Sequence, residues 1–219
     1  MKSIAVIGLD RFGITLATTL TQLGHQVLCI DKNETTIQAV ADIVTNAVCA
    51  NPTSEAALRA AGLKSFDATV ICLSDSMENS LLTVLAVKEI GINAITVRAI
   101  SDDHKKILEK LGISDIIYPE YDMATKLAYR INKSKIREYL EFSNDYSIIE
   151  VAVPEKWVGK TLRNLDVRNT YGINVIAISH PSSHSVDISI NPNNPLSKDD
   201  ALVLLGTDDI IQKFAKSID

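Results

Sequence analysis

The sequence predicts an α/β fold, in which a Rossmann-like doubly wound parallel sheet is followed by a small α+β module. Three observations support this prediction. A glycine turn directly follows the first apolar strand, short apolar strands alternate with helical segments up to about residue 118, and the pattern changes beyond residue 133. Continuous apolar strands separated by helices are typical of a parallel sheet that is covered on both faces.

The first strand leads directly into a glycine turn, in the segment Ile4-Ala5-Val6-Ile7-Gly8-Leu9-Asp10-Arg11-Phe12-Gly13. Gly8 and Gly13 stand where the G-x-G-x-x-G pattern of dinucleotide-binding turns has its first and third glycines, and Asp10 stands at the second. A phosphate approaches the bare backbone at that second glycine. Because like charges disfavour each other at short range, we expect the Asp10 carboxylate to oppose a bound phosphate, with Arg11 or a divalent cation able to offset it.

The elements after the turn complete a Rossmann-type half. Residues 11–23 carry an apolar stripe at helical spacing, formed by Phe12, Leu16, Leu20 and Leu23. A strand at 26–30 then runs into Asp31, the acidic residue expected about 20 positions beyond the glycines, where it holds the ribose diol of a nucleotide. The ordered set of strand, turn, helix, strand and acid predicts a nucleotide-binding half far better than the glycines alone.

The other elements of the first domain follow the same alternation. We expect strands at residues 3–7, 26–30, 47–50, 68–73, 94–97 and 115–117, and helices at 11–23, 34–43, 54–61, 77–90 and 102–111. Glycines punctuate helix ends, as is common at helix C-termini: Gly24, Gly62, Gly91 and Gly112.

Two helical segments have apolar faces that need covering. Residues 80–87 are apolar nearly all round, which predicts that this helix meets another subunit or lies under the second domain of its own chain. After Pro119-Glu120, a further helix carries the stripe Met123, Leu127 and Ile131. The charged segment 132–138 follows, and we therefore expect a first domain at 1–133 and a second at 134–219.

The second domain has a different pattern of predicted strands and helices. Residues 148–153, 174–178, 186–190 and 201–205 are predicted strands, and 209–216 a closing helix, with Trp157 as a packing anchor. This module is too small to be the substrate domain of a typical dehydrogenase.

The composition excludes several classes of protein. A net charge of −5, without a run of Lys or Arg that forms a patch, argues against a nucleic-acid partner. The start at residues 1–3 leads at once into a strand rather than a signal peptide, and the apolar runs are too short to cross a bilayer. We therefore expect a cytoplasmic protein without direct membrane insertion. Cys29, Cys49 and Cys72 fall in predicted buried strands, where reduced core cysteines are expected.

Several motifs together resemble the RCK (regulator of K+ conductance) family, of the KtrA/KtrC/TrkA type, from end to end of the chain. The segments that carry the resemblance are Val6-Ile7-Gly8-Leu9-x-Arg11-Phe12-Gly13, Asp31, Ala47-Val48-x-Ala50-Asn51, Ile117-x-Pro119-Glu120-x-Asp122-Met123-Ala124, and Gly159-x-Thr161-Leu162-x-x-Leu165-x-Val167-Arg168-x-x-Tyr171-Gly172-Ile173-Asn174-Val175-x-Ala177-Ile178. The last segment has no counterpart in dehydrogenases.

The resemblance implies a cytosolic gating subunit of a bacterial potassium transporter, assembled as a homodimer and commonly as an octameric ring beneath a membrane channel. It implies a bound ATP or ADP, with NAD or NADH as the alternative. Gly8 and Gly13 would frame the phosphates, Arg11 would reach the terminal phosphates, Asp31 would hold the ribose, and Asn51 would lie near the adenine.

Further site residues are implied by the same resemblance. Glu120 would hold Mg²⁺ or Ca²⁺ beside the triphosphate at the subunit interface, since a carboxylate oxygen suits these cations. Three positions complete the expected nucleotide site: Phe12, Lys32 and Arg98. In the second module, Arg168 and Asn174 match positions at which some relatives bind cyclic di-AMP across a dimer seam. Structural roles are the alternative, with Arg168 paired to Asp166 or Glu150 and Asn174 supporting the turn.

Other functions compete with this interpretation. Tyr129-Arg130-Ile131-Asn132-Lys133 has the Y-x-x-x-K spacing of short-chain dehydrogenases, which would make the chain an NAD(P)-dependent oxidoreductase, but it lies on the helix that leaves the sheet. A transcription regulator would need a basic reading helix, which the sequence lacks. A stand-alone nucleotide sensor stays open, because any transporter contact is made by another chain.

Overall fold

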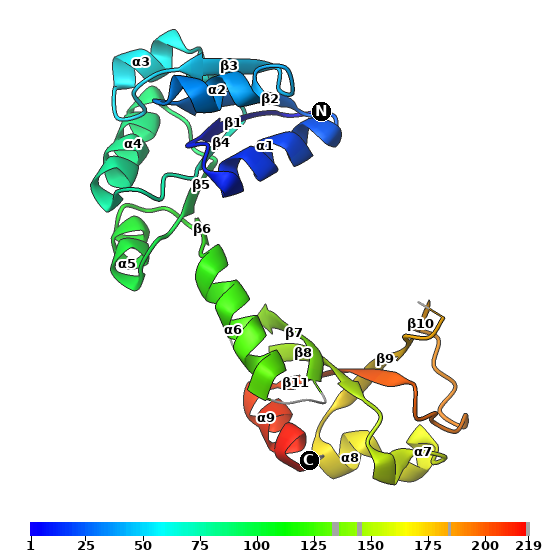
Figure 1. The fold of residues 1–219 in the computed structure, drawn as a ribbon. Coiled ribbons are helices and arrows are strands. Elements are labelled where there is room, and N and C mark those ends of the chain that lie inside the picture. The colour runs from blue at the N-terminus through cyan, green and yellow to red at the C-terminus, as the bar shows by residue number, and fades with distance from the viewer. Residues whose placement is uncertain (133–135, 144–145, 184, 218–219) are drawn as a thin grey trace. The chain divides into compact units, whose positions relative to one another are not determined.

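The computed structural model describes residues 1–132, 136–143, 146–183 and 185–217 (Figure 1). The chain divides into two compact units, at residues 1–120 and 121–219, and each unit has a sheet of its own. The expected boundary between 133 and 134 lies outside the described residues and stays a prediction.

The first unit is built on a parallel sheet of six strands in the order β3-β2-β1-β4-β5-β6. This is the strand order of a doubly wound Rossmann sheet, so the predicted fold class is confirmed. The strands are β1 (Ser3–Ile7), β2 (Gln26–Asp31), β3 (Asn46–Cys49), β4 (Ala68–Ile71), β5 (Ile95–Arg98) and β6 (Asp115–Ile117).

The helices of the first unit lie between these strands, as predicted. They are α1 (Arg11–Gln22), α2 (Glu34–Val40), α3 (Glu55–Ala60), α4 (Met77–Ile90) and α5 (Asp102–Lys110), with a 3₁₀ turn at Leu63–Ser65. Each begins after a capping residue whose side chain accepts a hydrogen bond from a first-turn amide: Asp10, Asn33, Ser54, Ser76 and Ser101. Such caps fix the starting points of the helices.

Apolar layers cover both faces of the sheet. Ala17 of α1 and Ile37 and Val40 of α2 pack with Val6 and Val27 on one face. Leu58 of α3, Val84 and Val87 of α4 and Leu108 of α5 pack on the other face (Figure 1). The chain crosses between faces where β3 leads to β4, which puts β1 and β4 side by side at the centre. Parallel strands of this kind end together at one edge, and the glycine turn lies at that edge.

The three cysteines differ in their surroundings. Cys29 and Cys72 are buried, as expected, and burial raises the pKa of each thiol to about 12. The expectation for Cys49 was wrong, because this residue is exposed. It ends β3, which is the edge strand of the sheet and pairs only with β2, so burial from a second neighbouring strand is lacking.

The second unit holds an antiparallel sheet of five strands in the order β10-β9-β11-β8-β7. The strands are β7 (Ile136–Ser143), β8 (Tyr146–Ala152), β9 (Asn174–His180), β10 (Ser185–Asp187) and β11 (Ala201–Thr207). The helices are α7 (Leu162–Leu165), α8 (Val167–Tyr171) and α9 (Asp208–Ser217), with a 3₁₀ turn at Glu155–Trp157; α6 (Pro119–Asn132) leads into this unit.

An aromatic cluster anchors the core of the second unit. Trp157 is buried, and its ring centroid lies 5.6 Å from those of Tyr171 and Phe214, which are 5.4 Å from each other. These separations are typical of favourable tilted and edge-to-face aromatic pairs. Trp157 is therefore the packing anchor that the sequence predicted.

Some elements of the second unit were not expected. No strand was predicted between the charged segment 132–138 and residue 143. The backbone of residues 136–143 nevertheless forms β7, which pairs with β8 through partners such as Tyr139 and Ile149. The expected strand at 186–190 is shorter, because the Asp187 side chain accepts a hydrogen bond from the Ser189 amide and turns the chain. Among the described helices, none is both long enough and apolar enough to cross a membrane.

Candidate functional site

The glycine turn follows β1 and has no room for side chains at its two glycines. Gly8 has φ = +93°, and a Cβ there would lie 2.9 Å from the Leu73 amide nitrogen. A Cβ on Gly13 would lie only 2.0 Å from the carbonyl oxygen of Gly8. The first and third glycines of the pattern are thus required by the turn and by the close contact between α1 and the strand end.

Asp10, at the second glycine position, adopts ordinary extended backbone angles (φ −70°, ψ −173°) and forms the N-cap of α1. Its Oδ1 accepts a hydrogen bond from the Gly13 amide at 3.0 Å, and its Oδ2 accepts one from Ser74 Oγ at 2.8 Å. The Asp10 carboxylate therefore bonds the first-turn amide at the N-terminus of α1. This position attracts anions in nucleotide-binding turns.

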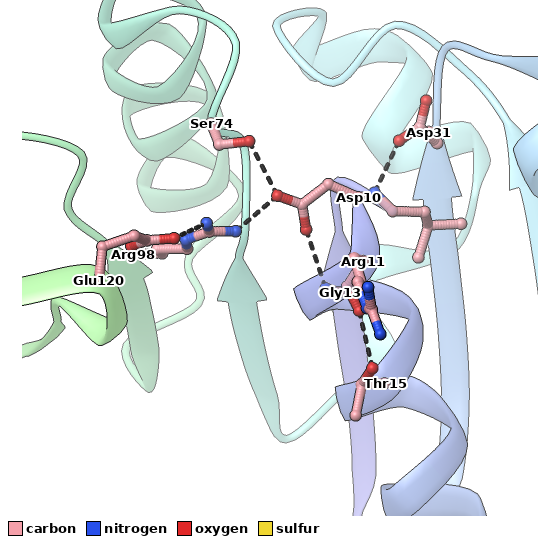
Figure 2. Close-up of polar contacts among 9 residues, drawn as sticks. Asp10, Arg11, Gly13, Thr15, Asp31, Ser74, Arg98 and Glu120 are labelled. Carbon is pink, nitrogen blue, oxygen red and sulfur yellow. Dashed lines mark hydrogen bonds and ion pairs between the residues drawn. The ribbon is translucent and has the colours of Figure 1, made fainter. Parts of the chain in front are cut away.

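Arg98 supplies the counter-charge for Asp10 (Figure 2). Its Nη1 lies 2.5 Å from Asp10 Oδ2, and its Nη2 is ion-paired with Glu120 at the start of α6. The guanidinium lies 5.2 Å from the centre of the Phe12 ring, within cation–π range. Only 10% of the Arg98 side chain is exposed. Arg98, rather than the expected Arg11 or a divalent cation, offsets the Asp10 charge.

The contacts around Asp10 and Arg98 keep both groups ionised. Burial alone would raise the pKa of Asp10, but hydrogen bonds from Gly13, Ser74 and Arg98 and the charge of Arg98 bring this pKa below its ordinary value. Burial would lower the pKa of Arg98, and its bonds to Glu120 and Asp10 raise it instead. The three groups Asp10, Arg98 and Glu120 therefore carry a net charge of −1.

A pocket of about 230 Å³ opens beside the turn, at the carboxyl ends of β1, β2 and β4. Asp31 lies in it, and its carboxylate accepts hydrogen bonds from the amides of Leu9 at 2.7 Å and Asn33 at 2.8 Å. These bonds fix the carboxylate at the pocket wall. The pocket is lined by Gly8, Leu9, Asp10, Asp31, Lys32, Asn33, Thr36, Pro52, Cys72, Leu73, Ser74 and Asp75.

Not all of the expected residues meet at this pocket. Arg11 is exposed on the first turn of α1, outside the pocket lining, and Figure 2 shows its side chain directed away from Asp10. Asn51 is exposed and accepts bonds from the amide and hydroxyl of Thr53. Gly8, Asp10, Asp31 and Lys32 do line the pocket, whereas Phe12 and Glu120 contact Arg98 behind it.

Ser74 and Asp75 belong to the site but were not predicted. Both follow β4, and Ser74 bonds to Asp10 while Asp75 pairs with Lys32 at 2.9 Å. The signal that could have found them is their position, since polar residues after a strand next to β1 must lie at the same sheet edge as the glycine turn.

Glu120 was expected to bind a divalent cation. In this structure its carboxylate is ion-paired with Arg98. The described residues contain no group of three or more His, Cys, Asp or Glu side chains that could hold a metal. One chain by itself therefore does not fit a metal ion at this point, and further ligands would have to come from a second copy.

Arg168 and Asn174 line a depression of about 360 Å³ in the second unit. Asp166, in the same lining, has the left-handed angle φ = +43°, and both of its oxygens accept bonds from Asn169 Nδ2. Two arginines and one aspartate thus border this depression. Its lining residues are Leu162, Arg163, Asp166, Val167, Arg168, Ile173, Asn174, Val175 and Pro192.

Comparisons with known proteins identify the family. Residues 4–119 match the TrkA-N domain model and residues 146–219 the TrkA-C domain model. The chain belongs to the RCK family of TrkA-type proteins. This RCK chain is 35% identical to Ktr system potassium uptake protein C of Bacillus subtilis over 217 residues, covering 99% of this chain and 97% of that protein. It is 36% identical to the Ktr system potassium uptake protein A of the same organism, covering 97% and 95%.

Solved structures share the fold of this RCK chain. The GsuK channel matches with a TM-score of 0.71 at 18% identity, over 97% of this chain and 38% of the channel, so the chain spans less than half of that protein. The NAD(P)-binding domain of an exopolyphosphatase-related protein from Archaeoglobus fulgidus matches with a TM-score of 0.52 at 25% identity, over 60% of this chain and 98% of that domain.

Proposed function

We propose that this RCK protein is a regulatory subunit of a potassium uptake system, and that it controls a membrane partner through a nucleotide bound in the pocket beside the glycine turn. The full-length similarity to Ktr potassium uptake proteins A and C of Bacillus subtilis carries the proposal. The pocket supports it, because Gly8, Asp31 and the α1 N-terminus meet there in the arrangement that Rossmann folds use for nucleotides.

The ligand of this pocket is proposed to be an adenine nucleotide. ATP and ADP are the first candidates, as the family resemblance implies. NAD or NADH is the alternative, and the similarity to the NAD(P)-binding domain from Archaeoglobus fulgidus supports it. Asp31 would accept the ribose hydroxyls from its fixed place at the end of β2. Arg11 would reach phosphate from its exposed position, in this chain or across a subunit interface.

The protein is proposed to act without catalysis. The one dehydrogenase-like pattern, Tyr129 to Lys133, ends outside the described residues, so it adds no geometry in favour of an oxidoreductase. An NADH oxidation assay with carbonyl substrates separates the two functions, since a regulatory subunit shows no turnover.

Assembly is part of the proposal. Leu82 and Leu85 of α4 and Met123, Leu127 and Ile131 of α6 are exposed apolar side chains, which suit contacts with further copies or with the partner. We propose a homodimer, closed into an octameric ring at the inner face of the membrane, in which Glu120 and further ligands from another copy would together hold Mg²⁺ or Ca²⁺. Light scattering that gives a single-chain mass at micromolar concentration would contradict this assembly.

A thermal-shift panel tests the nucleotide proposal directly. A ligand that binds only the native state raises the melting temperature. ATP, ADP, AMP, NAD and NADH are compared on the wild type and on Asp31→Ala, with Asp42→Ala as a control for an exposed aspartate outside the pocket. We expect a shift with the wild type and Asp42→Ala that is lost with Asp31→Ala. No shift with any of these ligands would reject the proposal.

A further inference from the structure

Asp10 bonds an amide of the kind that Rossmann folds offer to a nucleotide phosphate. Its Oδ1 accepts the hydrogen bond of the Gly13 amide at the start of α1, a twelve-residue helix. An amide at this place, combined with the helix dipole, is what normally attracts a phosphate oxygen. The carboxylate adopts this position with ordinary backbone angles, so the exchange of Gly for Asp introduces no backbone strain.

Arg98, the cation that contacts Asp10, is already paired with two carboxylates. Arg98 is nine-tenths buried, and its two terminal nitrogens are bound to Asp10 and Glu120. Among the described residues its Nε has no hydrogen-bond partner. Because this Nε is buried, a ligand phosphate could bond the guanidinium only through the two terminal nitrogens. It would then displace a carboxylate and leave it without its counter-charge, which costs free energy in a partly buried site.

The pocket lining carries more acid than base. Asp10, Asp31 and Asp75 line it together with Lys32, which is itself paired with Asp75. The lining therefore has a net charge of −2 with these groups ionised. Each further negative charge on a ligand meets repulsion from this wall, while a ribose hydroxyl meets the acceptors that it needs.

We propose that Asp10 determines ligand specificity at this turn: its carboxylate replaces a ligand phosphate, so that the pocket selects a nucleoside or a nucleoside monophosphate over di- and triphosphates. The inference rests on the proposed nucleotide-binding function and changes its order of candidate ligands, because it places adenosine and AMP ahead of the ATP and ADP that the family resemblance implies. Arg98 acts as a positioning residue, because it holds the Asp10 carboxylate in place through Nη1.

Calorimetric titration of the full-length protein with adenosine, AMP, ADP and ATP tests the proposal, in EDTA so that no divalent cation screens the phosphates. For the wild type we expect the affinity to fall with each added phosphate. Asp10→Asn keeps an acceptor for the Gly13 amide, but it removes the charge and puts an amide donor in place of the oxygen that accepts from Ser74 and Arg98. It should raise the affinity for ATP relative to AMP by about tenfold. Asp10→Gly, which also vacates the helix N-terminus, should raise it further. Asp42→Asn removes an equal charge outside the pocket and should leave the order of affinities unchanged.

The outcomes separate this inference from the function on which it rests. If the wild type binds ATP at least as tightly as AMP and Asp10→Asn leaves that ratio unchanged, the specificity role of Asp10 is rejected and nucleotide binding stands. If none of the ligands binds the wild type or either Asp10 variant, the nucleotide-binding function is rejected, and the inference with it.

Discussion

The two concave sites of this chain differ in how their charges are arranged. The pocket of the first unit is lined by three aspartates and one lysine, and the nearest arginine is buried and paired with carboxylates. The depression of the second unit is lined by two exposed arginines and one aspartate, whose oxygens are bound by Asn169. The first site therefore suits a ligand rich in hydroxyls, and the second suits an anionic one. If the proposal for Asp10 is correct, we expect the sign of the lining charge, rather than the glycine pattern, to decide which site favours phosphate.

The largest effect should come from closing the space at the glycine turn. Gly13→Ala brings a Cβ to 2.0 Å from the Gly8 oxygen, so α1 must move away from the strand end. We expect the first unit to lose about 3 kcal/mol or more of unfolding free energy. Gly24→Ala is the matched control, because a Cβ there meets nothing within 4 Å and adds only the cost of φ = +82°, about 1 kcal/mol. Urea denaturation followed by circular dichroism compares the two variants, and equal losses would contradict the tight contact.

The next effect concerns the second site. If its arginines bind a cyclic dinucleotide, as the family resemblance implies for Arg168 and Asn174, Arg168→Ala removes a charge-assisted hydrogen bond of about 1.5–3 kcal/mol and should weaken cyclic di-AMP binding by about tenfold or more. Titration of the full-length protein measures this loss. Arg11→Ala, in the first unit, serves as the control and should leave cyclic di-AMP binding intact. If the wild type shows no saturable binding, cyclic di-AMP is rejected as a ligand of the second unit.

A smaller effect is expected when the internal anion of the first unit is removed. Asp10→Ala deletes the N-cap of α1 and leaves Arg98 with one carboxylate, which should cost about 1–2 kcal/mol of unfolding free energy at pH 7. Because the pKa of Asp10 is lowered in the folded state, its contribution is present above the ordinary value of 3.8 and is lost as the pH falls through the folded pKa. The difference between wild type and variant should therefore shrink on acidification below that value. A difference that stays constant down to pH 2 would show that the charge of Asp10 is not involved.

The smallest effect should come from the exposed pair at the pocket mouth. Lys32 and Asp75 are both more than half exposed, so solvent screens their attraction. Thermal unfolding of Lys32→Ala should be indistinguishable from that of the wild type. Ligand binding is the more sensitive measurement, because the variant makes the pocket lining more negative. A clear loss of stability would mean that the pair is ordered more strongly than its exposure implies.

Local patterns in the sequence determined most of the first unit. The alternation of apolar strands with capped helices predicted its strands and helices closely, because each buried strand and each apolar helix stripe is a local requirement for covering the sheet. The glycine turn at Gly8 and Gly13 could also be predicted from the sequence, since glycine fits a positive φ or a close contact with a backbone carbonyl. In the second unit the prediction was poorer. The backbone of β7 is stabilised by pairing with β8, a partner that no local pattern in its charged segment indicates.

The interaction partner of Asp10 could be found only from the tertiary structure. The sequence places a carboxylate at the second glycine position of the turn. The charge that offsets it was expected to come from the adjacent Arg11 or from a divalent cation. The partner is Arg98, 88 positions along the chain, which reaches Asp10 because β5 lies beside β4 at the same edge of the sheet. Sequence spacing fixes which side chains share a helix face or a strand end. Only the strand order brings charges from distant segments within 3 Å of one another, and this order joins Asp10, Arg98 and Glu120 in one ion network.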